Sequence, residues 1–243
     1  MRSGLVVLVL LATPATASAG RTYYSWLYGT EVLPERGAEL MTWVAEQNDV
    51  TDQSHLAETR WWVSPLIGIT DQLELALPVE VAWDRAGGRT TSGLDRYGVE
   101  LRYRLVTQDP VDAPPLVPLV RVALKRIVTT DGRSTASPEA DIVVSYEQGN
   151  VHVLADLGGY GEISSDAHHF EVRPGAGISV RTIGDLRLGA EVHAELTLDQ
   201  GGSWAIVGPG MAWSHGRTWL SAMYGIGFYG IKDAPKVQWG IAF

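Results

Sequence analysis

The chain of 243 residues contains no cysteine, so disulfide bonds, thiolate metal sites and cysteine nucleophiles are all excluded. Basic residues are few, 19 against 28 acidic ones, and the net charge of -9 argues against a nucleic-acid partner. Beyond the first residues there is no apolar run of some 18 residues, which a membrane-spanning helix requires. Yet 45% of the residues are hydrophobic. The apolar residues are therefore dispersed, and their spacing decides which fold they predict.

The first residues have the composition of a secretory signal peptide. Arg2 supplies an early positive charge, an apolar run covers 5–12, and Ala17-Ser18-Ala19 has the small-x-small form of a cleavage site. The apolar run is too short to cross a bilayer as a helix, although a retained amino-terminal anchor is the alternative. We therefore predict a cleaved signal peptide over residues 1–19.

Apolar and polar residues alternate along most of the remaining chain. In the stretch "LELALPVEVAWD" (73–84), the apolar residues from Leu73 to Trp83 fall on one face and Glu74 and Glu80 on the other. This period of two predicts strands rather than helices. A soluble sandwich alternates as well, but its strands usually run about five or six residues. The alternating segments here run about ten to fourteen residues, the length that crosses a bilayer at a tilt.

We therefore predict an all-β fold: a transmembrane antiparallel up-and-down β-barrel of twelve strands, with ten as the alternative. The expected organisation is a periplasmic amino-terminal segment over 20–37 and an outer-membrane barrel over 38–243. Even strand numbers are typical of single-chain bacterial barrels. The predicted strands cover 38–47, 55–68, 73–83, 94–105, 116–128, 139–148, 151–161, 168–181, 185–198, 203–214, 218–230 and 235–243.

The final residues also favour a barrel. Trp239, Ile241 and Phe243 share one face of the last predicted strand. That strand must pair with the first one, because an open sheet edge is not tolerated in lipid. The ending is similar to the recognition signal that outer-membrane barrels present to the assembly machinery, so we expect these three residues to form an assembly signal.

Aromatic residues near the strand ends are expected to form interfacial girdles, where hydrocarbon meets lipid headgroups. A carbohydrate-binding row of aromatic rings is the functional alternative. The residues concerned are Tyr23, Tyr24, Trp26, Tyr28, Trp43, Trp61, Trp62, Trp83, Trp204, Trp213, Trp219, Tyr229 and Trp239.

The polar face of the strands carries the candidate functional residues. Twelve strands about 4.8 Å apart and tilted by about 40° close at a backbone diameter of roughly 24 Å, and side chains leave roughly 10 Å or less. The lumen is thus either a narrow charged passage or a plug of interlocked ion pairs. The inward-facing candidates are Glu74, Glu80, Arg96, Glu100, Arg102, Arg104, Arg121, Lys125, Asp141, Glu147, Asp156, Glu171, Arg173, Arg187, Glu191, His193 and Glu195.

Candidates for catalysis and metal binding are weak. Asp166 and His168 resemble the Asp-x-His pair of omptin-type barrel proteases, but the second acidic pair of those enzymes, Asp-x-Asp, is absent. The adjacent residues His168 and His169 would point to opposite faces of a strand and seldom share one metal ion. We therefore predict a protein that is not an enzyme, with no metal site and no cofactor.

Two stretches near the start of the predicted barrel carry a more specific pattern. The segments "GTEVLPERGAELMTW" and "PLIGITDQLELALPVEV" resemble the transporter-like outer-membrane barrels named after the MetA pathway of phenol degradation. The resemblance implies a barrel that moves small compounds, aromatic ones among them, and it identifies no substrate-binding residue. The matching residues are Thr30, Glu31, Leu33, Pro34, Gly37, Gly68, Thr70, Asp71, Leu73, Glu74 and Pro78.

The leading functional hypothesis is passive passage of a small solute across the bacterial outer membrane through a narrow charged lumen. The alternative is a closed barrel that serves as a structural scaffold, with outer loops or residues 21–36 docking a partner. The expected partners are outer-membrane lipid, the barrel-assembly machinery and an unidentified small solute, and no nucleic acid.

Overall fold

A computed structural model describes the chain apart from a few segments, and the predicted signal peptide lies outside the described residues. Among the residues described, no helix is long and apolar enough to cross a membrane. The described residues are 22–51, 57–108, 114–128, 134–165, 167–199 and 202–243.

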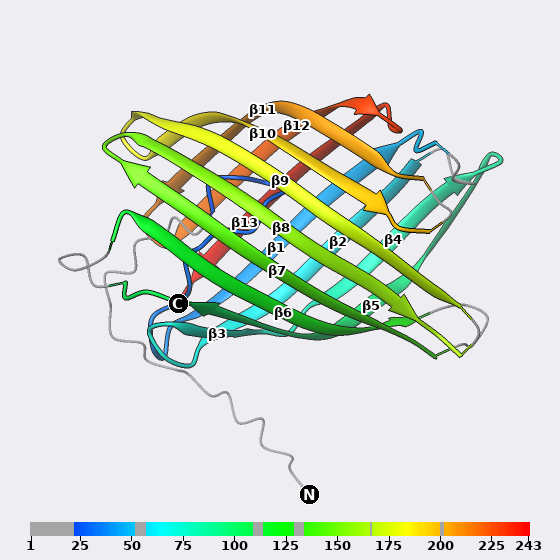
Figure 1. Cartoon of the computed structure of the whole chain (residues 1–243), viewed down its shortest axis with the longest axis horizontal. Helices are drawn as coiled ribbons and strands as arrows, with labels where there is room; N and C mark the ends of the chain where they lie inside the picture. The colour runs from blue at the N-terminus through cyan, green and yellow to red at the C-terminus, as the bar shows by residue number, and fades with distance from the viewer. Residues whose placement is uncertain (1–21, 52–56, 109–113, 129–133, 166, 200–201) are drawn as a thin grey trace, which may run out of the picture.

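The described residues form an all-β structure (Figure 1). The strands are β1 (Ala38–Asn48), β2 (Ala57–Gly68), β3 (Leu73–Ala76), β4 (Val79–Ala86), β5 (Arg89–Arg104), β6 (Leu116–Val128), β7 (Ser134–Gln148), β8 (Val151–Ile163), β9 (His168–Ile183), β10 (Leu186–Thr197), β11 (Trp204–His215), β12 (Thr218–Tyr229) and β13 (Asp233–Ala242).

The strands pair antiparallel with their neighbours in sequence, and β13 returns to pair with β1. The closure extends to the last residue, whose backbone N–H donates to the carbonyl oxygen of Ala38 at 2.9 Å. β3 and β4 together occupy one position, since each pairs with both β2 and β5. The described sheet is therefore a closed barrel with twelve strand positions, which confirms the predicted fold and strand number.

The break between β3 and β4 falls at Leu77 and Pro78. Proline has no backbone N–H to donate to a sheet, so a continuous ladder is interrupted there. Pairing is kept on both sides, because Leu77 donates to the carbonyl of Pro65 at 3.1 Å and Gly98 donates to the carbonyl of Pro78 at 3.0 Å. The barrel wall thus stays closed at an interrupted strand.

The barrel wall is apolar on the outside and polar on the inside, the reverse of a soluble protein. Large apolar side chains cover the outside, for example Leu124, Ile142 and Leu157, each with more than half of its surface exposed. Charged side chains such as Glu100 and Arg121 lie inside, where each has only 1% of its surface exposed. An apolar outer wall around a polar interior is the arrangement of a transmembrane barrel.

The aromatic residues divide between the two faces. Trp61, Trp213 and Trp239 are exposed on the outer wall, as expected for a girdle. The girdle prediction was wrong for Tyr23, Tyr24 and Tyr28, which lie inside the barrel in the stretch before β1. It was also wrong for five tryptophans inside the barrel: Trp26 belongs to that same stretch, and the other four are turned inward by their places in the strand alternation. The five are Trp26, Trp43, Trp62, Trp204 and Trp219.

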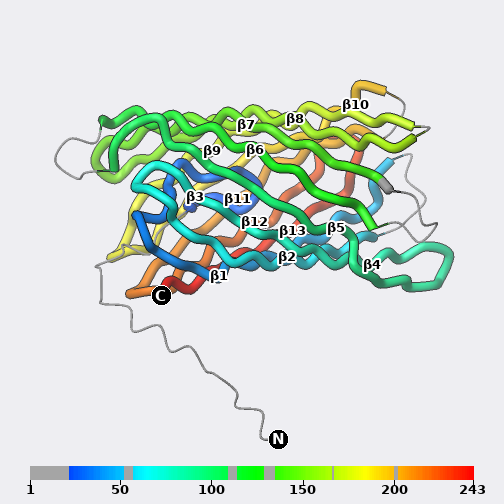
Figure 2. Tube along the Cα trace, turned by 90° about the horizontal axis from the view of Figure 1, so that it is seen from below, coloured from blue at the N-terminus to red at the C-terminus, as the bar shows by residue number. Residues whose placement is uncertain are grey.

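The start of β1 and the end of β13 lie at the same end of the barrel (Figure 2), which we call the terminal end. Two-residue turns close three hairpins there, and each contains a glycine with φ near 60°: Gly149, Gly184 and Gly216. In each turn only the first of the two central residues has positive φ, the type II′ pattern, and that position favours glycine. We call the opposite end, which carries the β4–β5 hairpin, the distal end.

The exposed apolar face predicts a stability change that depends on position. Ile142→Arg places a charge near the middle of β7 on the outer wall, and we expect it to lower the free energy of unfolding in lipid vesicles by about 2–4 kcal/mol. Gln148→Arg, on the same face at the end of β7, should cost at most about 1 kcal/mol. Denaturant unfolding of the folded protein in vesicles measures both values, and equal costs would contradict a lipid-facing wall.

Candidate functional site

In the stretch 22–37, residues 22–33 lie inside the barrel rather than outside it in the periplasm, and residues 34–36 are exposed at the terminal end (Figures 1 and 2). We call this stretch the lumenal segment. Tyr24 and Leu27 are almost fully buried, and they pack against Leu119, Val143 and Leu154 of the wall. The apolar side chains of the segment would be exposed to water in the periplasm, whereas the lumen offers them an apolar surface.

Three carboxylates of the wall bind the backbone of the lumenal segment. Glu191 accepts hydrogen bonds from the backbone N–H groups of Ser25 at 2.8 Å and Trp26 at 2.9 Å. Asp156 accepts one from the N–H of Tyr28 at 3.1 Å, and Glu74 accepts one from the N–H of Leu33 at 2.8 Å. Buried backbone N–H groups that are not paired in a sheet require such acceptors. These predicted lumen-lining residues therefore hold the segment in place.

Tyr24 adds further bonds near the terminal end. Its hydroxyl donates to the carbonyl oxygen of His152 at 2.9 Å, and its own carbonyl oxygen accepts from the hydroxyl of Ser221 at 3.2 Å and from the amide of Gln238. Further along the segment, a hydrogen bond of 2.6 Å joins the hydroxyls of Thr30 and Ser145. The segment is thus bound along its length to several strands.

Glycines of β9 make room for this segment. A Cβ atom on Gly175 would lie 2.2 Å from Leu27 Cδ2, and one on Gly177 would lie 2.4 Å from Tyr24 Cε1. Both distances are far below a van der Waals contact, so any larger residue would displace the segment. The missing side chains on β9 are therefore part of the site that holds residues 22–37.

Trp26 of the lumenal segment packs its ring against residues of the wall. Its ring stacks on His193 with centroids 5.4 Å apart and meets Trp204 edge-on at 5.5 Å. Its indole N–H donates to the carbonyl oxygen of Ala234 at 3.1 Å. The ammonium nitrogen of Lys236 lies 4.8 Å from the ring centroid, a cation–π contact.

A network of ion pairs surrounds Arg121 beside the segment. Its guanidinium donates to Asp141 at 2.5 Å, to Glu139 at 2.6 Å and to Glu100 at 2.7 Å. It also lies over the ring of Tyr28, 4.0 Å from the centroid. Burial raises the pKa of the Tyr28 phenol well above its usual value, so this ring stays neutral. Removal of one member of such a buried network leaves an uncompensated charge and is strongly destabilising.

Other ion pairs continue this network towards the distal end. Lys125 contacts Glu139 at 2.8 Å, and Arg96 donates to Asp95 at 2.8 Å. Arg173 donates to Glu171 at 2.6 Å. Near the terminal end, Arg187 pairs with Glu147 and covers the ring of Tyr23 at 4.0 Å, and burial raises the pKa of the Tyr23 phenol to about 12.

The predicted inward-facing residues all point into the barrel. Glu147, Glu171, Arg173 and Glu195 are partly buried, and the remaining ones are buried. The prediction missed further charged residues of the interior, among them Glu39, Glu58, Arg60, Glu139 and Lys236. The alternation of Lys236 with the outward residues Val237 and Trp239 was a signal that could have identified it.

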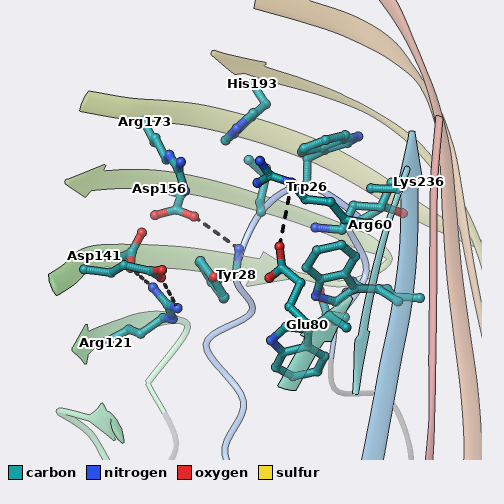
Figure 3. Close-up of a pocket in the computed structure, with 18 of the residues that line it drawn as sticks. Trp26, Tyr28, Arg60, Glu80, Arg121, Asp141, Asp156, Arg173, His193 and Lys236 are labelled. Carbon is teal, nitrogen blue, oxygen red and sulfur yellow. Dashed lines mark hydrogen bonds and ion pairs between the residues drawn. The ribbon is translucent and has the colours of Figure 1, made fainter. Parts of the chain in front are cut away.

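A cavity of about 110 Å³ lies where the segment meets the wall (Figure 3). Figure 3 shows Trp26 and Lys236 close together at this cavity, with Arg60 and Glu80 nearby. Residues lining the cavity include Trp26, Tyr28, Trp43, Arg60, Trp62, Glu80, Arg96, Lys125, Arg173, His193, Glu195 and Lys236.

The two stretches that carry the family resemblance contact each other at the terminal end. In addition to the bond between Leu33 and Glu74, the N–H of Glu35 donates to Asp71 at 3.0 Å. Gly68 donates to the carbonyl of Gly37 at 2.8 Å. The matching residues of the first stretch thus belong to the lumenal segment, and those of the second bind it.

No family model matches the chain, and no curated protein matches its sequence. Among solved structures, the β domain of the Bordetella autotransporter BrkA has a TM-score of 0.55 at 15% identity, covering 86% of this chain and 100% of that one. KdgM porin has a TM-score of 0.51 at 10% identity, covering 84% and 99%. The translocator domain of autotransporter NalP from Neisseria meningitidis has a TM-score of 0.50 at 10% identity, covering 87% and 89%.

These likenesses show the fold, and with the apolar outer wall they define the class of protein. The chain is an integral β-barrel of the bacterial outer membrane, with a porin-like architecture that contacts membrane lipid. They do not confirm the resemblance to the barrels named after the MetA pathway.

The comparisons also correct the prediction that the chain is not an enzyme. The similar structures already differ in kind, since KdgM is a porin whereas the BrkA and NalP barrels are domains of autotransporters. A fold does not by itself determine function, so the barrel does not support an absence of catalysis. Of the proposed Asp166 and His168 pair, Asp166 lies outside the described residues.

The close fit at β9 predicts that a larger side chain expels the lumenal segment. Because the chain lacks cysteine, Ser25→Cys introduces a unique thiol at a buried position of the segment. We expect slow labelling of this thiol by a water-soluble maleimide, and labelling at least about tenfold faster when Gly177→Val is added. Gly159→Val, on the outer face of the neighbouring strand, is the control and should leave the rate unchanged. Equal rates in all three proteins would contradict the packing described.

Proposed function

We propose that the barrel passes a small solute across the outer membrane and that the lumenal segment closes this passage in the structure described here. The observation that carries the proposal is a charged inner wall around a cavity that is bounded by residues 22–37. We assign the terminal end to the periplasm, because the exported amino terminus is expected there. The segment then extends from the periplasmic end deep into the lumen, where Trp26 contacts Trp204 and Ala234 near the start of β11 and β13.

The way in which the segment is bound supports a movable closure. It forms no strand of the barrel, and wall side chains rather than a sheet ladder satisfy several of its backbone N–H groups. Its departure would leave β1–β13 closed, since the pairing of the strands does not pass through residues 22–37. Opening therefore requires the exchange of side-chain hydrogen bonds and apolar contacts, without rupture of the wall.

Two finer expectations belong to this proposal. The resemblance to the barrels named after the MetA pathway supports a small compound as the solute, and the contacts between Leu33 and Glu74 join the two matching stretches. Trp239, Ile241 and Phe243 lie exposed on the outer wall of the closing strand, which fits a signal read by the assembly machinery before insertion.

A closed scaffold is the second candidate function. The observation that favours it is the dense pairing of interior charges around Arg121, together with the buried segment. A scaffold requires no opening, so it predicts a silent barrel whatever is done to residues 22–37. The two candidates therefore differ in one electrical measurement.

We expect Glu191→Ala to raise the open probability in planar-bilayer recordings. This change removes the acceptor of two backbone N–H groups of the segment, and a loss of about 2 kcal/mol would shift the closed–open equilibrium by roughly 30-fold. Deletion of residues 22–36 should give larger and steadier conductance than the full chain. Glu171→Ala serves as the control, because it removes an interior carboxylate that bonds to His169 and Arg173 of its own strand.

Heat-modifiable migration on gels and circular dichroism verify that each variant is a folded barrel. Folded barrels that stay silent after both Glu191→Ala and the deletion would overturn the channel and favour the scaffold. An equal rise of open probability in Glu171→Ala would show that charge alone, and not release of the segment, controls conductance.

A further inference from the structure

We infer that the lumenal cavity is a binding site for a small carboxylate, with Lys236 as the cation that anchors it and Trp26 and Trp43 as its walls. The inference deepens the proposed function, on which it rests, by assigning a chemical class to the solute.

Lys236 differs from the other cations that line the cavity. Those others have carboxylate partners: Arg60 pairs with Glu58, and Lys125 with Glu139, for example. Within the described part of the chain Lys236 forms no ion pair, and its ammonium nitrogen lies between two rings, 4.8 Å from the centroid of Trp26 and 4.5 Å from that of Trp43.

Ring faces attract a cation but leave its hydrogen-bonding capacity unused. An ammonium group has three N–H donors and no acceptor, so Lys236 lacks the oxygen atoms that such a group requires when it leaves water. The nearby carboxylates have other partners, because Glu191 accepts from the lumenal segment and Glu195 lies 3.7 Å from Arg173. A ligand in the cavity can supply the missing acceptor in place of water, and a carboxylate supplies both oxygens and charge.

The volume of the cavity and its aromatic side chains limit the size and polarity of the ligand. Trp43 stacks parallel to Trp62, with centroids 6.0 Å apart and planes 10° apart, and both residues line the cavity, so its wall beside Lys236 is apolar. A cavity on the order of 150 Å³ holds benzene in another protein. About 110 Å³ therefore suits roughly four to six non-hydrogen atoms, the size of a short-chain carboxylate.

The site lies at the contact between the lumenal segment and the wall. Lys236 belongs to β13, Trp43 to β1 and Trp26 to the segment, so a ligand at Lys236 touches all three. Recognition of the carboxylate thus takes place at the surface that closes the passage.

Binding is tested with the full folded chain in detergent micelles, by calorimetry and by tryptophan fluorescence. The probes are butyrate, its neutral analogue butyramide, and n-butylammonium. We expect saturable binding of butyrate that is at least about tenfold tighter than that of either analogue. Benzoate, which exceeds the cavity, should bind more weakly than butyrate.

Three variants separate the anchor from the general charge of the lumen. Lys236→Met should weaken butyrate binding at least about tenfold, and Lys236→Arg should keep it within about threefold. Lys125→Met is the matched control, because it removes another lysine of the same cavity, one whose charge is paired with Glu139, and it should weaken binding by less than about threefold. The folded state of each variant is verified by gel mobility, and Trp43→Leu gives a second test of the site if Lys236→Met does not fold.

Equal affinities for butyrate and butyramide, no saturable binding, or equal losses in Lys236→Met and Lys125→Met would overturn the inference. Its failure is distinguishable from that of the channel. Conductance that rises on release of the segment without butyrate binding refutes only the carboxylate site. Butyrate binding to a barrel that stays silent refutes only the channel.

Discussion

Closure of the sheet is the constraint on which the rest of the structure depends. In hydrocarbon every backbone N–H and C=O group must find a partner within the protein, so β13 has to pair with β1. Closure forces one face of every strand towards lipid and the other into a confined interior. The apolar belt and the buried charges are two results of the same geometry, and they exchange places relative to a soluble protein.

The interior then has to satisfy its own charges with little water. Arg121 with its three carboxylates meets this requirement by pairing across neighbouring strands. Glu191 and Asp156 meet it by binding the backbone of residues 22–37. The lumenal segment therefore satisfies polar and apolar groups of the interior together. Its N–H donors bind acceptors of the wall, and its apolar side chains pack against leucines and a valine of the wall.

Among the cations that line the cavity, Lys236 is the one without an ion pair within the described chain, and the proposed carboxylate site rests on it. Two tryptophan rings hold its ammonium group without supplying an oxygen. One of these rings, Trp26, belongs to the lumenal segment, and the other, Trp43, belongs to the wall. The unpaired ammonium group therefore lies at the contact between the segment and the wall.

The period of two in the amino-acid sequence determined the strands, their number, the faces of the wall and the residues that point inward, because register in a barrel allows only one face to meet lipid. It did not determine where residues 22–37 lie, since they have no period and Glu191 is 166 positions away from Ser25. The inward tryptophans were misplaced because an aromatic ring suits an interface and a packed lumen equally well. Only the closed tertiary structure decided these points, because contacts between distant residues exist only after the sheet has curved around them.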